Sequence, residues 1–161
     1  MQKNDGFTLI ELLIVVAIIG IIAAIAVPGL LRARMSGNET SAIGSLRAIN
    51  TAQVNYASAA GQGGYATTLP ILATACPGAT GGFISPDLSA ATPTKSGYTI
   101  TMVGAGAGPN DCNGTASSTT YAATAVPVTV GTTGNRGFNT NQAGTIFFDP
   151  AGGAAGTTPI Q

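Results

Sequence analysis

The feature that most constrains this chain is a run of 20 uncharged residues, from Leu12 to Leu31, made mostly of Ile, Val, Leu and Ala. As a helix it would be about 30 Å long, which is roughly the hydrocarbon thickness of a bilayer. It is longer than the apolar part of an ordinary secretory signal, about 7–15 residues, and it runs into Arg32 without a small-residue cleavage site. Glu11 stands directly before it. The run therefore predicts a membrane-spanning helix with a charge at its start.

The composition excludes several classes of function. Only 7% of the 161 residues are charged and the formal net charge is zero, so there is no basic patch to bind nucleic acid. The chain has no histidine, which rules out Ser-His-Asp and Cys-His catalysis and His-ligated zinc. Its two cysteines cannot build a four-thiolate site, and long stretches separate Asp87, Asp111 and Asp149. We expect no enzyme activity, no cofactor and no metal.

Three kinds of short motif give only weak indications of a binding or modification site. Gly104–Gly108 lacks the Gly-Lys-Ser/Thr ending of a phosphate loop and is predicted to be a loop between strands. Asn110–Gly114 is rich in oxygen ligands but lacks the closing glutamate of a calcium loop, so a tight turn is predicted. Asn38 and Asn113 each begin an N-glycosylation triplet, which arises easily by chance in a threonine-rich chain, and neither is assigned.

Residues 7 to about 60 are predicted to form one long helix. Its weak points are Gly20 and Pro28, because glycine lowers helix propensity and proline removes a backbone donor and clashes with the preceding turn. A kink near Pro28 is expected, and the alternative is that Pro28 ends the helix. The glycine-rich segment 60–64 is predicted to terminate it.

The second half of this helix is predicted to be amphipathic. Asn50 and Gln53 interrupt its apolar arc, while Arg34, Glu39 and Ser41 fall mostly elsewhere on the wheel. Tyr56 is expected to pack in the core against a sheet. The predicted apolar side consists of Ile43, Leu46, Ile49, Val54, Tyr56 and Ala57.

The remainder is predicted to be a loop followed by antiparallel strands. Tyr65–Pro93 has no clear period, and alternation with β-branched residues marks the strands that follow. The fold class is therefore α+β: a long N-terminal helix, its first half apolar and protruding, with a small antiparallel sheet packed on its second half. Ala151–Gln161 is expected to be mobile. The predicted strands are Gly97–Val103, Thr119–Val128 and Gly144–Asp149, with Phe138 and Asn139 pairing with the last of them across Asn141–Gly144.

The segment from Gly6-Phe7-Thr8-Leu9-Ile10-Glu11 to Pro28 resembles the N-terminus of the type IV pilins and of the related pseudopilins of type II secretion. In that family a membrane peptidase cuts after the glycine, the new N-terminus is methylated, and the apolar helix becomes the filament core. The resemblance implies a leader at 1–6, cleavage between Gly6 and Phe7, methylation of Phe7, and assembly through Phe7 and Glu11. Such leaders are usually basic, but here Asp5 cancels Lys3.

The resemblance also implies a domain order and a set of partners. After the leader, residues 7–31 form the transmembrane and filament-core helix, 32–60 its amphipathic half, and 61–161 the loop and sheet domain. The expected partners are other copies of the chain in a helical filament, a prepilin peptidase, the inner-membrane assembly machinery, and the membrane before assembly. The expected location is the inner membrane and then an extracellular pilus.

Cys76 and Cys112 are predicted to form a disulfide. In an exported chain, two cysteines in Gly/Pro-rich segments pair more often than they stay free. The alternative is a pair of buried free thiols. Family members often carry a disulfide, but commonly nearer the C-terminus, so the family's disulfide-bounded surface region is not transferred to particular residues here.

Three functions fit the sequence. The first is a major pilin, whose assembled filaments serve adhesion, twitching motility or DNA uptake in the family. The second is a type II secretion pseudopilin, which typically has an acidic calcium loop near its end, whereas Ala151–Gln161 has no acidic residue. The third is a membrane-anchored periplasmic binding module, which would have no need of Glu11 in its anchor.

Overall fold

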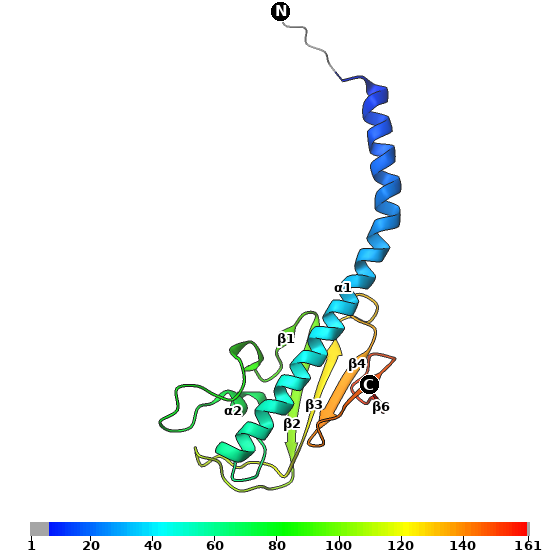
Figure 1. Ribbon diagram of the computed structural model, residues 1–161. Coiled ribbons are helices and arrows are strands. Elements are labelled where there is room, and N and C mark those ends of the chain that lie inside the picture. The colour runs from blue at the N-terminus through cyan, green and yellow to red at the C-terminus, as the bar shows by residue number, and fades with distance from the viewer. Residues whose placement is uncertain (1–6, 161) are drawn as a thin grey trace, which may run out of the picture. The chain divides into compact units, whose positions relative to one another are not determined.

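The computed structural model describes residues 7–160, and its chain divides into two compact units between Arg34 and Met35. Helix α1, Leu9–Ala59, contributes its first part to the N-terminal unit and its second part to the globular unit (Figure 1).

Helix α1 has the length that the sequence predicts. The alternative that Pro28 ends the helix is wrong, because α1 continues through it to Ala59. The glycine-rich segment terminates the helix: the amides of Gly61 and Gly63 bond back to the carbonyls of Tyr56 and Ala57, and Gly63 has φ of 91°, which glycine adopts without steric cost. The kink expected near Pro28 remains a prediction.

The globular unit contains a six-stranded antiparallel sheet in which each strand pairs with the next along the chain (Figure 1). The α+β prediction is therefore confirmed. The expected hairpin across Asn141–Gly144 is present, and it joins β4 to β5. Two-residue strands at both edges, β1 and β6, were not predicted. The strands are β1 Thr94–Lys95, β2 Tyr98–Ala105, β3 Thr120–Pro127, β4 Gly137–Asn141, β5 Ile146–Asp149 and β6 Thr158–Pro159.

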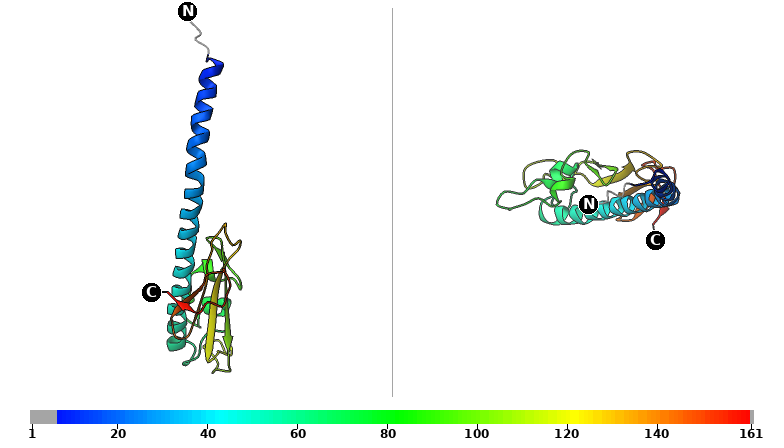
Figure 2. Two further views of the ribbon diagram at one scale, coloured as in Figure 1. Left: turned by 90° about the vertical axis from the view of Figure 1, so that its right-hand side faces the viewer. Right: turned by 90° about the horizontal axis from the view of Figure 1, so that it is seen from above.

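The loop after α1 carries two short helical pieces, α2 (Leu69–Ala73) and η1 (Pro86–Leu88). Figure 2 shows the sheet and these pieces lying along one side of the second half of α1. One core fills the space between them, because alternate sheet residues such as Ile100, Ala123 and Phe138 are fully buried together with helix residues such as Leu46 and Ile49.

The buried face of α1 differs from the predicted apolar arc. Val54 was predicted to be in the core but is 62% exposed, whereas Gln53, predicted to interrupt the arc, is fully buried. Glu39 was placed off this face and is also buried. The reason is that polar groups on the opposite side of the interface satisfy these side chains, so burial does not leave them unpaired.

Part of the C-terminal segment pairs with β5, which the sequence did not predict. Strand β6 pairs with Phe147 and Phe148, and the Ile160 amide donates to the carbonyl of Ile146. The segment has no strand-like alternation of its own, so its pairing depends on β5, and the expected mobility of Ala151–Gln161 stays a prediction.

Candidate polymerisation site

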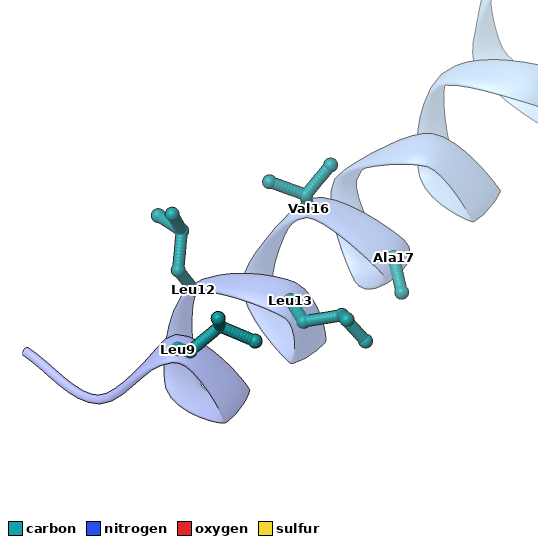
Figure 3. A pocket seen from close by; sticks show the side chains of 5 residues that line it. All are labelled: Leu9, Leu12, Leu13, Val16 and Ala17. Carbon is teal, nitrogen blue, oxygen red and sulfur yellow. The ribbon is translucent and has the colours of Figure 1, made fainter.

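The N-terminal part of α1 is apolar on every side and exposed. Its large hydrophobic side chains stand at 42–81% exposure between Leu9 and Leu31. An open apolar groove along the first turns is lined by Leu9, Leu12, Leu13, Val16 and Ala17 (Figure 3). Within residues 7–160, α1 holds the one stretch long and apolar enough to cross a membrane. This surface requires a cover of lipid or protein.

Phe7, Thr8 and Glu11 stand at the start of this surface. Phe7 is 80% exposed. Thr8 precedes the first helical residue, and its hydroxyl accepts a hydrogen bond from the Glu11 amide at 3.2 Å. Thr8 thus caps the helix, and Thr8-Leu9-Ile10-Glu11 has the spacing of a capping box, with the carboxylate favoured by the positive end of the helix dipole. The Thr8 cap was not predicted, although the spacing of Thr8 and Glu11 is a local signal for it.

The two positions predicted to weaken the helix, Gly20 and Pro28, are interior positions of α1. An added Cβ at Gly20 would meet nothing within 4 Å, so neither packing nor backbone conformation within the chain requires a glycine there. Gly6, the residue before the expected cleavage, lies outside the described residues.

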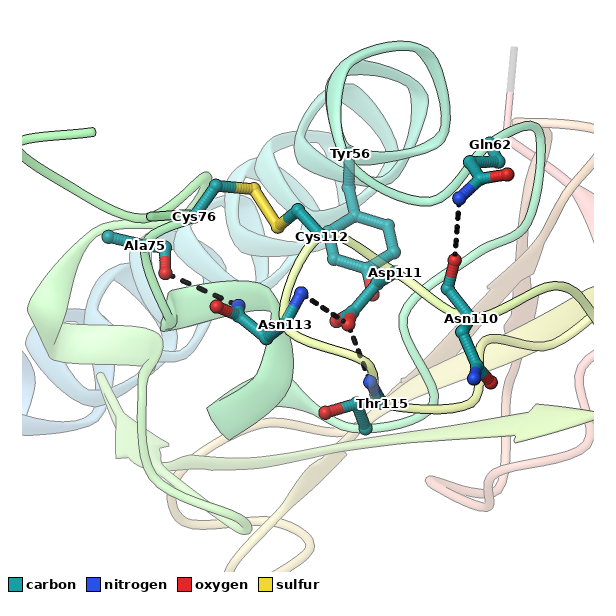
Figure 4. Close-up of a disulfide and its surroundings, with 9 residues drawn as sticks. All are labelled: Tyr56, Gln62, Ala75, Cys76, Asn110, Asp111, Cys112, Asn113 and Thr115. Carbon is teal, nitrogen blue, oxygen red and sulfur yellow. Dashed lines mark hydrogen bonds between the residues drawn. A yellow bond between two sulfur atoms is a disulfide. The ribbon is translucent and has the colours of Figure 1, made fainter. Parts of the chain in front are cut away.

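The globular unit holds the disulfide that the sequence predicted. Cys76 and Cys112 are joined, with their Cα atoms 5.6 Å apart and a sequence separation of 36 (Figure 4). Cys112 lies in the predicted tight turn, and its amide donates to the carbonyl of Ala60 at the end of the long helix. The bridge therefore ties together the α2 region and the turn beyond β2.

Asp111 organises that turn through its buried carboxylate. Its Oδ1 accepts from the amides of Asn113 and Thr115, at 2.9 and 2.7 Å, and its Oδ2 accepts from the Tyr56 hydroxyl at 2.8 Å (Figure 4). Three donors satisfy the carboxylate, so it needs no cation. Tyr56 is buried as predicted and packs edge-on against Phe83 at 5.4 Å between ring centroids.

Burial, followed by the nearby Asp111 carboxylate, raises the pKa of the Tyr56 phenol well above its usual value. Across residues 7–160, no group of three or more His, Cys, Asp or Glu side chains could hold a metal ion. The structure brings none of the separated carboxylates together: Asp87 pairs with Lys95 and Asp149 accepts from the Ala151 amide.

Comparison with known protein families identifies the N-terminal region. Residues 1–27 match the family model described as the prokaryotic N-terminal methylation motif. The N-terminal segment carries this motif and is similar to the corresponding part of type IV pilins. The chain is 50% identical over 54 residues to the type IV major pilin protein PilA of Myxococcus xanthus, which is 34% of this chain and 24% of the relative.

Two further relatives are similar to this chain over a comparably short stretch. The type IV wide pilus major component PilA4 of Thermus thermophilus is 60% identical over 40 residues, or 25% of this chain and 30% of that protein. A fimbrial protein of Pseudomonas aeruginosa is 50% identical over 52 residues, or 32% and 34%. The chain thus spans about a quarter to a third of the length of these curated relatives. No solved structure matches it.

Proposed function

We propose that this chain is a structural subunit, a major pilin, that polymerises into a type IV pilus through residues 7–31. The observation that carries the proposal is a helix that is apolar and exposed all round, with one carboxylate, Glu11, at its start. Before assembly a bilayer covers such a surface, and in a filament the helices of neighbouring copies cover it. The pilin-type N-terminal motif supports the same assignment.

The proposal includes a route to the filament. A prepilin peptidase removes residues 1–6 by cutting between Gly6 and Phe7, and the new amine of Phe7 is methylated. The subunit waits in the inner membrane until the assembly machinery moves it into an extracellular filament. A helix capable of crossing a membrane and the methylation-motif match support this route.

The alternatives have less support. A pseudopilin of type II secretion would typically carry an acidic calcium loop near its end, and residues 151–161 contain no acidic side chain. A membrane-anchored periplasmic binding module gives no reason for a carboxylate at Glu11, which is costly inside an apolar segment. Adhesion, motility and DNA uptake are activities of assembled pili in the family, and no residue here selects among them.

The direct test is to isolate filaments sheared from the surface of cells that express the chain. Electron microscopy should show thin filaments, and intact-mass measurement of their main component should give a chain beginning at methylated Phe7. A surface filament whose subunit keeps residues 1–6, or a chain found only as a membrane-anchored monomer, would contradict the proposal.

A further inference from the structure

The junction between α1 and the loop that connects β3 to β4 is held by polar contacts. The Asn38 side-chain amide donates to the carbonyl of Thr133 at 2.8 Å. Glu39 Oε1 accepts from the backbone amides of Asn135 and Arg136, at 3.0 and 3.2 Å. These contacts lie within the globular unit, just past its start at Met35. Along α1 they are the first tertiary hydrogen bonds within this unit.

Glu39 and Arg136 also form a two-pronged ion pair. Glu39 Oε2 accepts from Arg136 Nε at 2.8 Å and lies 2.7 Å from Nη2. The Glu39 side chain is only 10% exposed. The guanidinium carbon stands 5.6 Å from the ring centroid of Phe138 and 5.5 Å from that of Phe148, so two aromatic rings fix its position. Both guanidinium nitrogens share one carboxylate oxygen, and such charge-assisted hydrogen bonds are stronger than those between neutral groups.

No apolar side chain of α1 is fully buried before Ala42, although Met35 is half-buried. The first buried apolar residue of α1 is Ala42, and the first large one is Leu46. The polar contacts that hold residues 35–41 to the rest of the globular unit are those of Asn38 and Glu39 and the Ser41–Ser96 hydroxyl pair at 2.9 Å. Glu39 takes part in four interactions here, more than either Asn38 or Ser41, so its charge state bears most on these contacts.

We propose that Glu39 and Arg136 form an acid-sensitive clamp that fixes the point at which α1 joins the globular unit. A protonated Glu39 loses its charge, and one of its oxygens becomes a donor, so it can no longer satisfy the two amides and the guanidinium together. Residues 35–41 and the loop 128–136 then separate, while the core from Ala42 onward stays packed. The proposal concerns the monomer and does not depend on polymerisation.

The charged and titratable groups that face Glu39 set the sign of the pH dependence. They are Arg136, from the β3–β4 connection, and the Tyr98 phenol of β2, whose pKa burial and then the Glu39 charge raise to about 12. Burial raises the pKa of Glu39, but the hydrogen bonds from Asn135 and Arg136 outweigh burial and lower it overall. The clamp therefore adds stability above the ordinary carboxyl value of about 4, and that stability is lost as the pH falls through the lowered pKa.

The test is amide hydrogen exchange by mass spectrometry on the full chain in detergent, at a series of pH values and corrected for intrinsic exchange. As the pH falls below about 4, peptides 35–41 and 128–136 should lose protection by roughly tenfold or more, as expected when a charge-assisted hydrogen bond is lost. Peptides from β2 and β3 should remain protected. Glu39→Gln should show the same loss already at neutral pH, with little further change in acid.

Asp87→Asn is the matched control, because it removes the other ion pair, Asp87–Lys95, which is exposed. It should leave the exchange of both peptides as in the unaltered chain. Two results would overturn the proposal. One is acid exchange in which these peptides open only together with β2 and β3. The other is a Glu39→Gln chain that keeps full protection at neutral pH. The pH series of the unaltered chain decides the question even if the variant fails to fold.

Discussion

Gln53 in α1 and Ala66 in the following loop exchange two hydrogen bonds, as neighbouring strands do. Gln53 Nε2 donates to the carbonyl of Ala66 and the Ala66 amide donates to Gln53 Oε1, both at 2.9 Å. Both residues are fully buried. One polar side chain in the helix thus satisfies both backbone polar groups of Ala66, and this holds the start of the loop against the helix.

Replacing Gln53 by Leu should destabilise the globular unit by about 2–4 kcal/mol. The substitution keeps the approximate volume but leaves a buried amide and a buried carbonyl at Ala66 without partners, and each such group costs about 1–3 kcal/mol. Urea unfolding followed by circular dichroism measures the effect. Val54→Gln, at the next position but on the exposed side, is the control and should change stability by less than about 0.5 kcal/mol. Equal effects at the two positions would contradict the assigned face.

Gln53 also shows why the sequence predicted the elements of the fold better than their contacts. The apolar run and the alternation in β2 and β3 depend on local periodicity, which is visible along the chain. The partner of Gln53 is a backbone unit in a loop without a periodic pattern, and the partners of Glu39 lie 96 and 97 residues away. In the sequence, Gln53 therefore looked like a polar interruption of the apolar side of α1. Strands β1 and β6 have two residues each, too few for alternation to appear.

In the candidate site and the globular unit, too, features with a local sequence signal could be predicted, and contacts between distant residues could not. Phe7 and Glu11 were found because a short local motif carries them, and the Thr8 cap has a local signal of its own at spacing 8–11. The Cys76–Cys112 bridge was predictable because the chain has only two cysteines. The bonds from Asp111 to Tyr56 and from Glu39 to Arg136 were not, since nothing in a single sequence pairs residues so far apart.

Alkaline pH should destabilise the globular unit through its buried tyrosines. Burial raises the pKa of Tyr98 and of Tyr121 to about 12, and it raises that of Tyr56 as well. An unfolded tyrosine ionises near pH 10. Stability from the neutral phenols is therefore complete below about pH 10 and is lost as the pH rises through the folded values.

The measurement is the urea midpoint between about pH 9 and about pH 12, together with tyrosinate absorbance of the folded chain. The midpoint should fall over this range, and most tyrosinate should form only on unfolding. Tyr121→Phe removes one such phenol, which donates to Asn50 Oδ1 at 3.0 Å, and should make the fall shallower. Ionisation of all four tyrosines near pH 10 without unfolding would show that none of these phenols is protected.

Reducing the Cys76–Cys112 disulfide should lower the stability of the globular unit and leave its sheet formed. For a sequence separation of 36, the chain-entropy model gives up to about 4 kcal/mol, and measured values are often smaller. Unfolding with and without a phosphine reductant measures the loss, and the Cys76→Ala, Cys112→Ala double variant should match the reduced chain. Alkylation of the denatured, unreduced exported chain should label no thiol, and two labelled cysteines would disprove the bridge.

The last prediction concerns Glu11 and rests on the proposed assembly. Glu11 lies four residues beyond Phe7, about 6 Å along a helix, and Thr8 already caps the Glu11 amide. In a membrane the carboxylate can reach the nearby interface, but between packed helices it cannot. A buried unpaired carboxylate costs several kcal/mol, so it needs a cation, and methylation leaves the Phe7 amine charged. Pairing with the amine of a neighbouring copy would also fix the axial stagger.

Glu11→Ala should therefore leave membrane insertion, leader removal and folding of the globular unit intact while surface filaments become scarce or absent. Glu11→Gln should be similarly impaired, because it can form hydrogen bonds but carries no charge to pair with the amine. Thr8→Ser keeps both the capping hydroxyl and the Glu11 charge, so it is the control variant and should assemble normally. The readouts are filament yield by electron microscopy, and intact mass and circular dichroism of the membrane-held chain. Abundant, normally ordered filaments from both Glu11 variants would show that the carboxylate does not control subunit register.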